Sequence, residues 1–214
     1  MTIEIKRLTL GVAATNCYIV GDTQTQQAVL IDPVDDAQLL YNTARDAGWE
    51  IELILATHGH YDHILASLEL VELTEAPFYI HHNAPQISAL EEQSALVRQL
   101  FPPVPKPDKL LADTLEVIEL GSIRLETLYT PGHAPGHICY YMRDQGLLFG
   151  GDCLFAGSIG RTDLPYADHT TLLNSIFEKL IPLGDETQVL PGHMGPTTIG
   201  RERRTNPFLM NRNS

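Results

Sequence analysis

Three histidines and an aspartate lie close together in the segment Thr57–His63, which reads THGHYDH. His58 and His60 are two residues apart, so on an extended segment leaving a strand their imidazoles point to the same side. The glycine between them leaves the backbone free to wrap around an ion. Asp62 and His63 fall where a helix is expected to begin, which brings them back toward the same point. Since imidazole and carboxylate groups are good ligands for transition metals, this segment predicts a metal site.

Two further histidines follow a shared local pattern. Thr130–His133 reads TPGH and Leu190–His193 reads LPGH, and each follows a stretch with the character of a strand. A Pro-Gly pair stops a strand in a turn, so each stretch should project a histidine from the end of its strand. The two turns thus place His133 and His193 in equivalent positions, each at the end of a strand.

The elements that must position these side chains follow from hydrophobic periodicity and from the placement of Gly and Pro. Strands are predicted at Thr2–Leu10, Asn16–Gly21, Ala28–Ile31, Ile51–Ala56, Pro77–Ile80, Leu115–Ile118, Arg124–Tyr129, His137–Arg143, Leu147–Phe149 and Gln188–Leu190. Helices are predicted at Asp36–Ala47, from Asp62 or His63 to about Leu73, at Ser88–Leu100 and at Asp168–Leu180. The proline-rich stretch Phe101–Pro107 predicts a stiff, exposed connection. This order implies an α/β (α+β) fold of two mixed sheets flanked by helices.

Length and composition favour a single globular domain over residues 1–214. The three cysteines, Cys17, Cys139 and Cys153, stand among apolar neighbours, which suits buried, reduced thiols. The amino terminus alternates polar and apolar residues, unlike a signal peptide, and no apolar run approaches the ~20 residues that cross a bilayer. We therefore expect a cytoplasmic protein without a membrane partner.

The formal net charge of −13 argues against a nucleic-acid partner, because binding to phosphates depends on clustered Lys and Arg. The basic residues near the end of the chain are interpreted as a solvated helix face. They are Arg201, Arg203, Arg204 and Arg212.

Together these motifs resemble the metallo-β-lactamase superfamily over essentially the whole chain. The family's later ligands match His133 in TPGH, Asp152 in FGGD (Phe149–Asp152) and His193 in LPGH. The resemblance implies a four-layer αββα sandwich with the site at one edge of the sheets. It also implies that His58, His60 and His133 hold one ion, that Asp62, His63 and His193 hold a second, and that Asp152 bridges both.

Such a centre would bind one or two divalent ions, with Zn as the first expectation and Fe or Mn as alternatives. A water shared by two ions loses much of its proton affinity, which gives a hydroxide near neutral pH that can attack an acyl carbonyl. Asp62 is predicted to be catalytic as well as a ligand, because it would accept a hydrogen bond from this nucleophile.

Within the superfamily, the chain looks most like the short, single-domain glyoxalase II group. The stretches that carry this likeness are Gly151–Asp163 (GDCLFAGSIGRTD), Pro191–Thr198 (PGHMGPTT) and Glu202–Phe208 (ERRTNPF). The group implies hydrolysis of small-molecule thioesters, as in conversion of S-lactoylglutathione to glutathione and lactate. Full-length glyoxalase II enzymes add a carboxy-terminal helical domain that helps to hold glutathione, and we expect none here. Tyr61 and Arg161 are the candidate substrate-binding residues.

Other functions stay open at this point. Iron-dependent glutathione persulfide dioxygenases of the superfamily use the equivalents of His58, His133 and Asp152 as a two-histidine, one-carboxylate triad. A lactonase and a non-catalytic metal-binding module are weaker alternatives. The best-known subclass of β-lactamases carries a cysteine at the position of Asp152, which argues against that subclass. Metal identity, the filling of the second site, the physiological substrate and the oligomeric state are left open by the sequence.

Three more histidine positions have weaker claims. His137 lies four residues after His133 and either hydrogen-bonds a ligand or is structural. The pair His81-His82 is interpreted as structural, and His169 as a surface residue.

Overall fold

The computed structural model describes residues 2–85, 102–164 and 166–210. Most of the strands of the amino-terminal half form one six-stranded sheet in the order β1-β2-β3-β4-β5-β6. Its strands are β1 (Ile3–Leu10), β2 (Thr15–Asp22), β3 (Gln27–Ile31), β4 (Glu50–Leu55), β5 (Phe78–His81) and β6 (Lys109–Leu111). The first three strands pair antiparallel, and β3 to β6 run parallel. The carboxyl ends of these four strands therefore meet at one edge of the sheet.

A second six-stranded sheet has the order β14-β13-β10-β9-β8-β7. Its strands are β7 (Val117–Leu120), β8 (Ile123–Tyr129), β9 (Ile138–Met142), β10 (Leu147–Gly151), β13 (Gln188–Pro191) and β14 (Thr197–Thr198). The pair β10–β13 is parallel, so the residues that follow these two strands emerge side by side. A small hairpin of β11 (Leu154–Phe155) and β12 (Ser158–Ile159) follows β10 directly.

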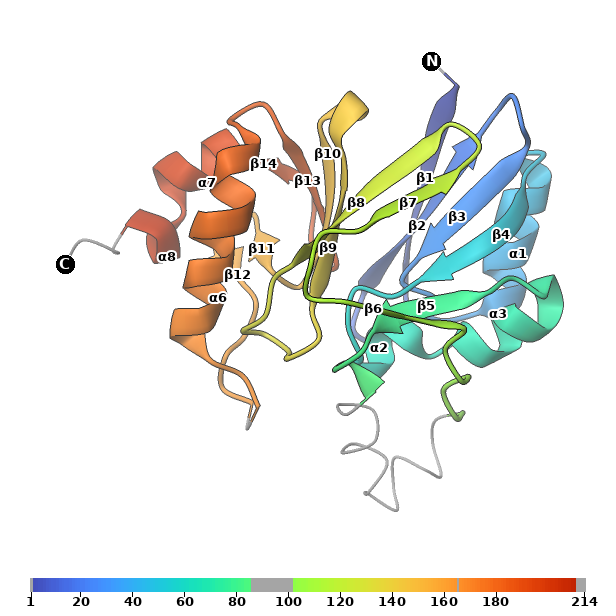
Figure 1. The fold of residues 1–214 in the computed structure, drawn as a ribbon, viewed down its shortest axis with the longest axis horizontal. Helices are drawn as coiled ribbons and strands as arrows, with labels where there is room; N and C mark the ends of the chain where they lie inside the picture. Colours follow the sequence, from blue (N-terminus) through green and yellow to red (C-terminus); the bar gives the residue numbers. More distant parts are fainter. Residues whose placement is uncertain (1, 86–101, 165, 211–214) are drawn as a thin grey trace.

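Helices cover the outer face of each sheet (Figure 1). On the first sheet lie α1 (Ala37–Asp46) and α3 (Ser67–Thr74), with the short α2 (Tyr61–Ile64) at the sheet edge. On the second lie α6 (His169–Ser175), which continues as a π-helical turn η2 (Ile176–Leu180) and a 3₁₀ turn η3 (Ile181–Leu183), then α7 (Ile199–Thr205) and α8 (Pro207–Met210). A 3₁₀ turn, η1 (Arg143–Gln145), joins β9 to β10. The four-layer αββα sandwich implied by the resemblance is confirmed.

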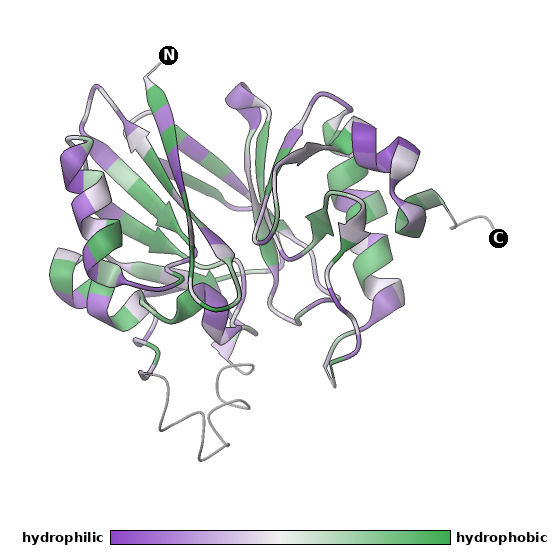
Figure 2. Cartoon of the chain, turned by 180° about the vertical axis from the view of Figure 1, so that it is seen from behind, coloured by the Kyte–Doolittle hydropathy of each residue, from purple (hydrophilic) through white to green (hydrophobic). Residues whose placement is uncertain are grey.

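Three layers of apolar side chains hold the sandwich together. In β2, Cys17 and Ile19 face the helices α1 and α3, whereas Tyr18 and Val20 face the second sheet. A third layer joins the second sheet to α6 and α7. In Figure 2 hydrophobic residues run along the strands of both sheets, while the helices carry hydrophilic residues on their outward sides. Truncating one of the fully buried leucines to alanine should cost about 2–5 kcal/mol.

The structure corrects several of the predicted elements. The helix expected from Asp62 or His63 to Leu73 is divided into α2 and α3. At the break, the Ala66 N–H donates to the Pro33 carbonyl at 2.9 Å, so a tertiary hydrogen bond takes the place of a helical one. Four short strands, β6, β11, β12 and β14, were not predicted. The helix predicted at Ser88–Leu100 lies outside the described residues.

Other predictions are confirmed. All three cysteines are buried and free. In α7, the side chains of Arg201, Arg203 and Arg204 are 52–63 % exposed, as expected for a solvated face. Arg212, the fourth residue of this basic cluster, lies outside the described residues. Residues 102–107 form no helix or strand, although Pro105 is buried, so this connection is not exposed throughout. Among the described residues, no helix has the length and apolar character that a membrane span requires.

Candidate metal centre

Three buried imidazoles meet where β4 and β8 end. His58 and His60 follow β4 in an extended segment, and His133 leaves the turn after β8. His58 Nε2 lies 2.8 Å from His60 Nδ1, and His133 Nε2 lies 3.0 Å from the same atom. We call these three residues the three-histidine group.

A second group, which we call the aspartate–histidine group, consists of Asp62, His63 and His193. Asp62 and His63 lie in α2, and His193 follows β13. Asp62 Oδ2 lies 3.3 Å from His193 Nε2 and 3.5 Å from His63 Nε2. The helix start returns Asp62 and His63 to the side of His58, as the sequence predicted.

Asp152 lies between the two groups, at the end of β10. Its Oδ1 is 3.4 Å from His63 Nε2, and its Oδ2 is 3.3 Å from His193 Nε2 and 3.6 Å from His133 Nε2. The carboxylate therefore faces both groups at once. All seven side chains predicted as ligands converge on this one place.

The donors of this cluster fit metal ions better than they fit one another. Within the described residues, His63 Nε2 and Asp152 Oδ1 are buried and have no hydrogen-bond partner. A buried polar atom without a partner costs about 1–3 kcal/mol, which a ligated cation would offset. In the three-histidine group, three ring nitrogens approach one another, and a single proton cannot satisfy them all. These His/Asp clusters can therefore hold divalent metal ions.

The two groups have opposite electrostatic character. Burial, followed by the charges of neighbouring histidines, holds the pKa of His58 well below its usual value and lowers the pKa of His60 to about 3. Burial also lowers the pKa of His133, against the opposing effect of Asp152. These three rings are neutral, with lone pairs available to an ion.

In the aspartate–histidine group, the neighbouring carboxylates affect the pKa values of the histidines more than burial does. Burial lowers the pKa of His193, but hydrogen bonds to Asp152 and Asp62 outweigh it and raise the pKa to about 10. His63 responds in the same way, because Asp152 and Asp32 raise its pKa more than burial lowers it. Burial raises the pKa of Asp152, yet His63 and His193 bring it well below its usual value. This half of the site attracts positive charge.

Asp32, the residue directly after β3, fixes His63. Its Oδ2 accepts hydrogen bonds from His63 Nδ1 and the Thr57 hydroxyl, each at 2.9 Å, and its Oδ1 accepts from the Thr57 N–H at 2.7 Å. Because Asp32 accepts from Nδ1, the neutral form of His63 that a metal ion requires would keep its proton on Nδ1 and turn the lone pair of Nε2 toward the cluster. Asp32 is 2 % exposed and has a left-handed φ of 57°.

In the three-histidine group, each ring also has a hydrogen-bond partner on the nitrogen that faces away from the other two rings, which we call its outer nitrogen. His58 Nδ1 lies 3.0 Å from the Thr57 hydroxyl, and His60 Nε2 lies 2.8 Å from the Tyr166 hydroxyl. His133 Nδ1 donates to the Arg161 carbonyl at 2.9 Å. Such partners orient the rings of metal-ligating histidines and select their tautomers.

His137 supports Asp152 through the backbone. The Asp152 N–H donates to His137 Nε2 at 3.0 Å, so His137 Nδ1 carries the proton that it shares with the Thr130 hydroxyl at 2.8 Å. Of the two alternatives left open for His137, the structure thus shows a hydrogen bond to a predicted ligand residue, made through the Asp152 backbone. On the other side of the site, the Thr15 hydroxyl donates to Asp62 Oδ2 at 2.8 Å.

The glycines of both Pro-Gly-His turns are required by close packing. A Cβ on Gly132, which has a φ of 130°, would lie 2.2 Å from the Leu172 nitrogen. A Cβ on Gly192 would lie 2.4 Å from Asp152 Oδ1 and 2.7 Å from His63 Cε1. The chain thus passes directly beside the ligand side chains, which a larger residue would displace.

The two predicted substrate-binding residues occupy different surroundings. Tyr61 begins α2 and is 8 % exposed. The Arg161 guanidinium is 62 % exposed and pairs with Asp163 through two hydrogen bonds of 2.7 and 2.8 Å. The contact between Arg161 and the centre comes from its backbone carbonyl rather than its side chain. Substrate binding by both residues stays a prediction.

Two other places on the molecule have features of a site, a second histidine–aspartate cluster and a pocket. His81 Nε2 and His82 Nε2 both lie close to Asp113 Oδ1, at 2.9 and 2.7 Å. However, His81 Nδ1 accepts the Asn83 N–H at 3.2 Å, so Nε2 must carry the proton and has no lone pair for an ion. This agrees with the structural role expected for the pair.

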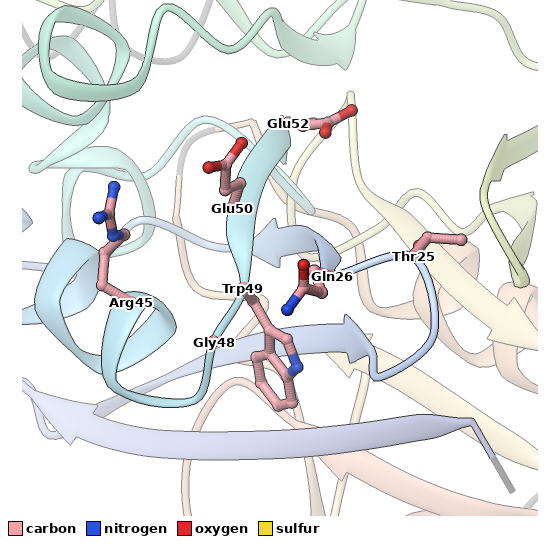
Figure 3. A pocket seen from close by; sticks show the side chains of 7 residues that line it. All are labelled: Thr25, Gln26, Arg45, Gly48, Trp49, Glu50 and Glu52. Carbon is pink, nitrogen blue, oxygen red and sulfur yellow. The ribbon is translucent and has the colours of Figure 1, made fainter.

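The pocket drawn in Figure 3 is lined by charged and polar side chains together with Trp49. Arg45 and Glu50 belong to it, and Glu50 is the first residue of β4. The pocket therefore lies at the amino ends of β3 and β4, away from the ligand cluster at their carboxyl ends, and it contains none of the predicted site residues.

The sequence matches the family model of the metallo-β-lactamase superfamily over residues 10–193. Among relatives, the hydroxyacylglutathione hydrolase GloC of Haemophilus influenzae is 34 % identical over 220 residues, with 98 % of each chain covered. The probable metallo-hydrolase YqgX of Bacillus subtilis is 37 % identical over 207 residues, with 95 % of this chain and 96 % of the relative covered.

Several solved structures are similar to this chain over nearly its whole length. The BLEG-1 B3 metallo-β-lactamase has a TM-score of 0.88 and 37 % identity, with 96 % of this chain and 99 % of that chain covered. TTHA1623 in a di-iron-bound form has a TM-score of 0.83 and 37 % identity, with 95 % and 100 % covered. ETHE1 from Myxococcus xanthus has a TM-score of 0.80 and 28 % identity, with 95 % and 83 % covered.

Proposed function

Because this chain belongs to the metallo-β-lactamase superfamily, we propose that it is a metal-dependent hydrolase of thioesters of the hydroxyacylglutathione type. The observation that most supports this is the convergence of both ligand groups on Asp152, whose buried Oδ1 has no partner among the described residues. The likeness to GloC over nearly the full length of both chains supports the thioester as substrate.

In this proposal the three-histidine group holds one ion, the aspartate–histidine group holds a second, and Asp152 contacts both. When bound, the ions would lower the pKa of a water molecule and polarise the thioester carbonyl. The three-histidine group contributes neutral nitrogens whose outer atoms are fixed by Thr57, Tyr166 and the Arg161 carbonyl. The protein thus provides a preorganised set of donors.

Asp62 has a second task as the hydrogen-bond acceptor for the attacking water. Its side chain is 35 % exposed, whereas that of Asp152 is 10 % exposed, so Asp62 is the ligand carboxylate that water reaches more readily. The Thr15 hydroxyl donates to its Oδ2 and keeps the carboxylate turned toward the centre. The bonds to Thr15 and His193 lower the pKa of Asp62, against the effect of burial, and keep the carboxylate ionised.

A thioester suits this site because a thiolate is a good leaving group. An amide nitrogen must be protonated as it leaves, which calls for a positioned acid. The buried rings of the three-histidine group are neutral and their outer nitrogens are already bonded, so they are poor acids. Hydrolysis of β-lactams is nevertheless the second candidate, because BLEG-1 is 37 % identical over almost the whole chain.

Zinc is the first proposal for the ions, since neutral imidazoles and carboxylates suit it well. Iron would suit the same donors. TTHA1623, which is 37 % identical to this chain, has a structure in a di-iron-bound form. Iron would also be required for the persulfide dioxygenase alternative, which uses only His58, His133 and Asp152.

One experiment separates these functions. The protein is purified without added metal, its metal content is measured, and the same sample is assayed for three activities. These are hydrolysis of S-lactoylglutathione, oxygen consumption with glutathione persulfide, and hydrolysis of a chromogenic cephalosporin. We expect about two ions per chain and turnover of the thioester alone. Oxygen consumption by an iron-loaded sample, or faster turnover of the cephalosporin, would refute the proposal in favour of the corresponding alternative.

A further inference from the structure

Glu202 in α7 is a buried carboxylate outside the ligand cluster. It is 0 % exposed, and a buried carboxylate is tolerated only when hydrogen bonds satisfy its oxygens. The Thr197 hydroxyl donates to Oε1, and the Gly157 N–H donates to Oε2 at 2.7 Å. Asn206, four residues further along, donates its Nδ2 to the same Oε2 at 3.0 Å.

These bonds hold the turn of the β11–β12 hairpin. Gly157 lies in that turn with a φ of 75°, between the paired residues Phe155 and Ser158. Asn206 Nδ2 also donates to the Ser158 carbonyl at 2.9 Å. Two side chains at the end of α7 therefore bind the same hairpin turn, Glu202 through the Gly157 N–H and Asn206 through the Ser158 carbonyl.

The hairpin leads directly into the metal centre. Gly160, which follows β12, packs so closely that a Cβ there would lie 2.0 Å from the Asp152 carbonyl and 3.1 Å from His133 Cβ. The next residue, Arg161, accepts the hydrogen bond of His133 Nδ1 through its carbonyl. The position of the hairpin thus determines where the partner of His133 lies.

We propose that Glu202 and Asn206 are positioning residues of the metal centre, which fix the Arg161 carbonyl through the hairpin and so present the Nε2 lone pair of His133 to an ion. The proposal depends on the proposed function only in taking His133 as a metal ligand. It also gives a role to part of the ERRTNPF stretch, which the thioesterase proposal does not explain. Neither residue touches the ion or the substrate.

The test uses Glu202→Gln and Asn206→Asp in the full-length protein. Gln keeps the size of Glu202 but lacks one of its acceptor oxygens. Asp keeps the Oδ1 of Asn206, which accepts from the Phe208 N–H, and lacks the donor. The first readout is the nitrogen NMR of the imidazoles in metal-free protein, where wild-type His133 should carry its proton on Nδ1. The second readout is the dissociation constant for cobalt(II) measured by absorption.

We expect His133 to lose its fixed tautomer in both variants. The affinity for cobalt(II) should fall by about 10- to 100-fold, which is the usual effect of removing a hydrogen-bond partner of a metal-ligating histidine. Leu180→Ala is the control, because it opens a cavity in the same layer and lowers Tm without removing a hydrogen bond of the hairpin. It should leave both readouts unchanged.

If Glu202→Gln does not fold, Asn206→Asp decides the question. An unchanged His133 tautomer and unchanged cobalt(II) affinity in a folded variant would overturn the proposal. The same losses in Leu180→Ala would also overturn it, because general loosening would then account for them. Neither readout measures thioester hydrolysis, so failure here is distinct from failure of the proposed activity.

Discussion

The three-histidine group and the aspartate–histidine group lie on either side of Asp152, yet they differ in burial and in charge. The side chain of His133 is 2 % exposed, whereas those of His193 and Asp62 are 23 % and 35 % exposed. The buried rings are neutral, while the exposed half carries a carboxylate and a histidine with a pKa raised to about 10.

This difference indicates a division of labour. In the three-histidine group every outer nitrogen has a protein partner, so the donors are rigid before an ion arrives. In the aspartate–histidine group, His193 and Asp62 are partly open to solvent, and the proposed substrate would enter from this side. We expect the first group to keep its ion and the second to exchange it more readily.

The largest effect is expected from His133→Ala. It removes one of three neutral donors from the buried group, so the retained ion should be lost and kcat/KM should fall by about 10³-fold or more. The measurement is metal content together with S-lactoylglutathione turnover, and His169→Ala on α6 is the control. Full metal content with full turnover would show that His133 is no ligand.

Asp62→Asn should reduce activity less, and through kcat rather than KM. The amide cannot accept a proton as a carboxylate does, so kcat should fall by about 10²-fold while KM changes little. Steady-state kinetics on metal-reconstituted protein separate the two constants. An unchanged kcat would mean that the ions alone orient the attacking water.

His193→Ala tests the difference between the groups most directly. Since His193 belongs to the exposed half, we expect the loss of one ion of two and a fall in kcat of about tenfold. Metal analysis after dialysis, compared with His133→Ala under identical conditions, gives the answer. If both variants lose all metal and all activity, the two ions bind as a unit and the proposed division of labour is wrong.

The sequence predicted the parts of the centre that local patterns encode. Two histidines separated by one residue after a strand, the helix start that follows them, and a Pro-Gly-His turn after each of two other strands are short-range signals. Asp152 was expected from the family resemblance alone. The structure brings all seven residues together. Their roles as metal ligands stay predictions. The αββα architecture followed from the order of the elements and from the resemblance.

The partners that orient the rings could not be predicted, because they come from distant parts of the chain. Tyr166 is 106 residues from His60, and Thr15 is 47 residues from Asp62. Asp32 had the best available signal, a carboxylate at the end of a buried strand next to β4. The break between α2 and α3 has the same origin, since it depends on the Pro33 carbonyl reaching Ala66.

The smallest effect is expected from Arg161→Lys, because this exposed side chain belongs to neither the three-histidine group nor the aspartate–histidine group. The proposed substrates, thioesters of glutathione, are anionic, and this chain carries a net charge of −13, so a local cation would be needed to hold them. The Arg161 side chain is exposed and its backbone carbonyl contacts the centre, but its guanidinium already pairs with Asp163 through two hydrogen bonds. That pairing lowers the pKa of Asp163 to about 2, and the Asp163 carboxylate would compete with the carboxylates of an anionic substrate for Arg161.

Arg161→Lys loses the planar two-pronged grip on a carboxylate but keeps the charge and the backbone carbonyl that holds His133. We therefore expect KM for S-lactoylglutathione to rise by only about fivefold, the modest size typical of an exposed ion pair, with kcat and Tm unchanged. Asp163→Asn gives the matched test, because it frees the guanidinium and should lower KM. If Arg161→Lys instead lowers Tm and neither variant changes KM, Arg161 holds the loop and the substrate carboxylate binds elsewhere.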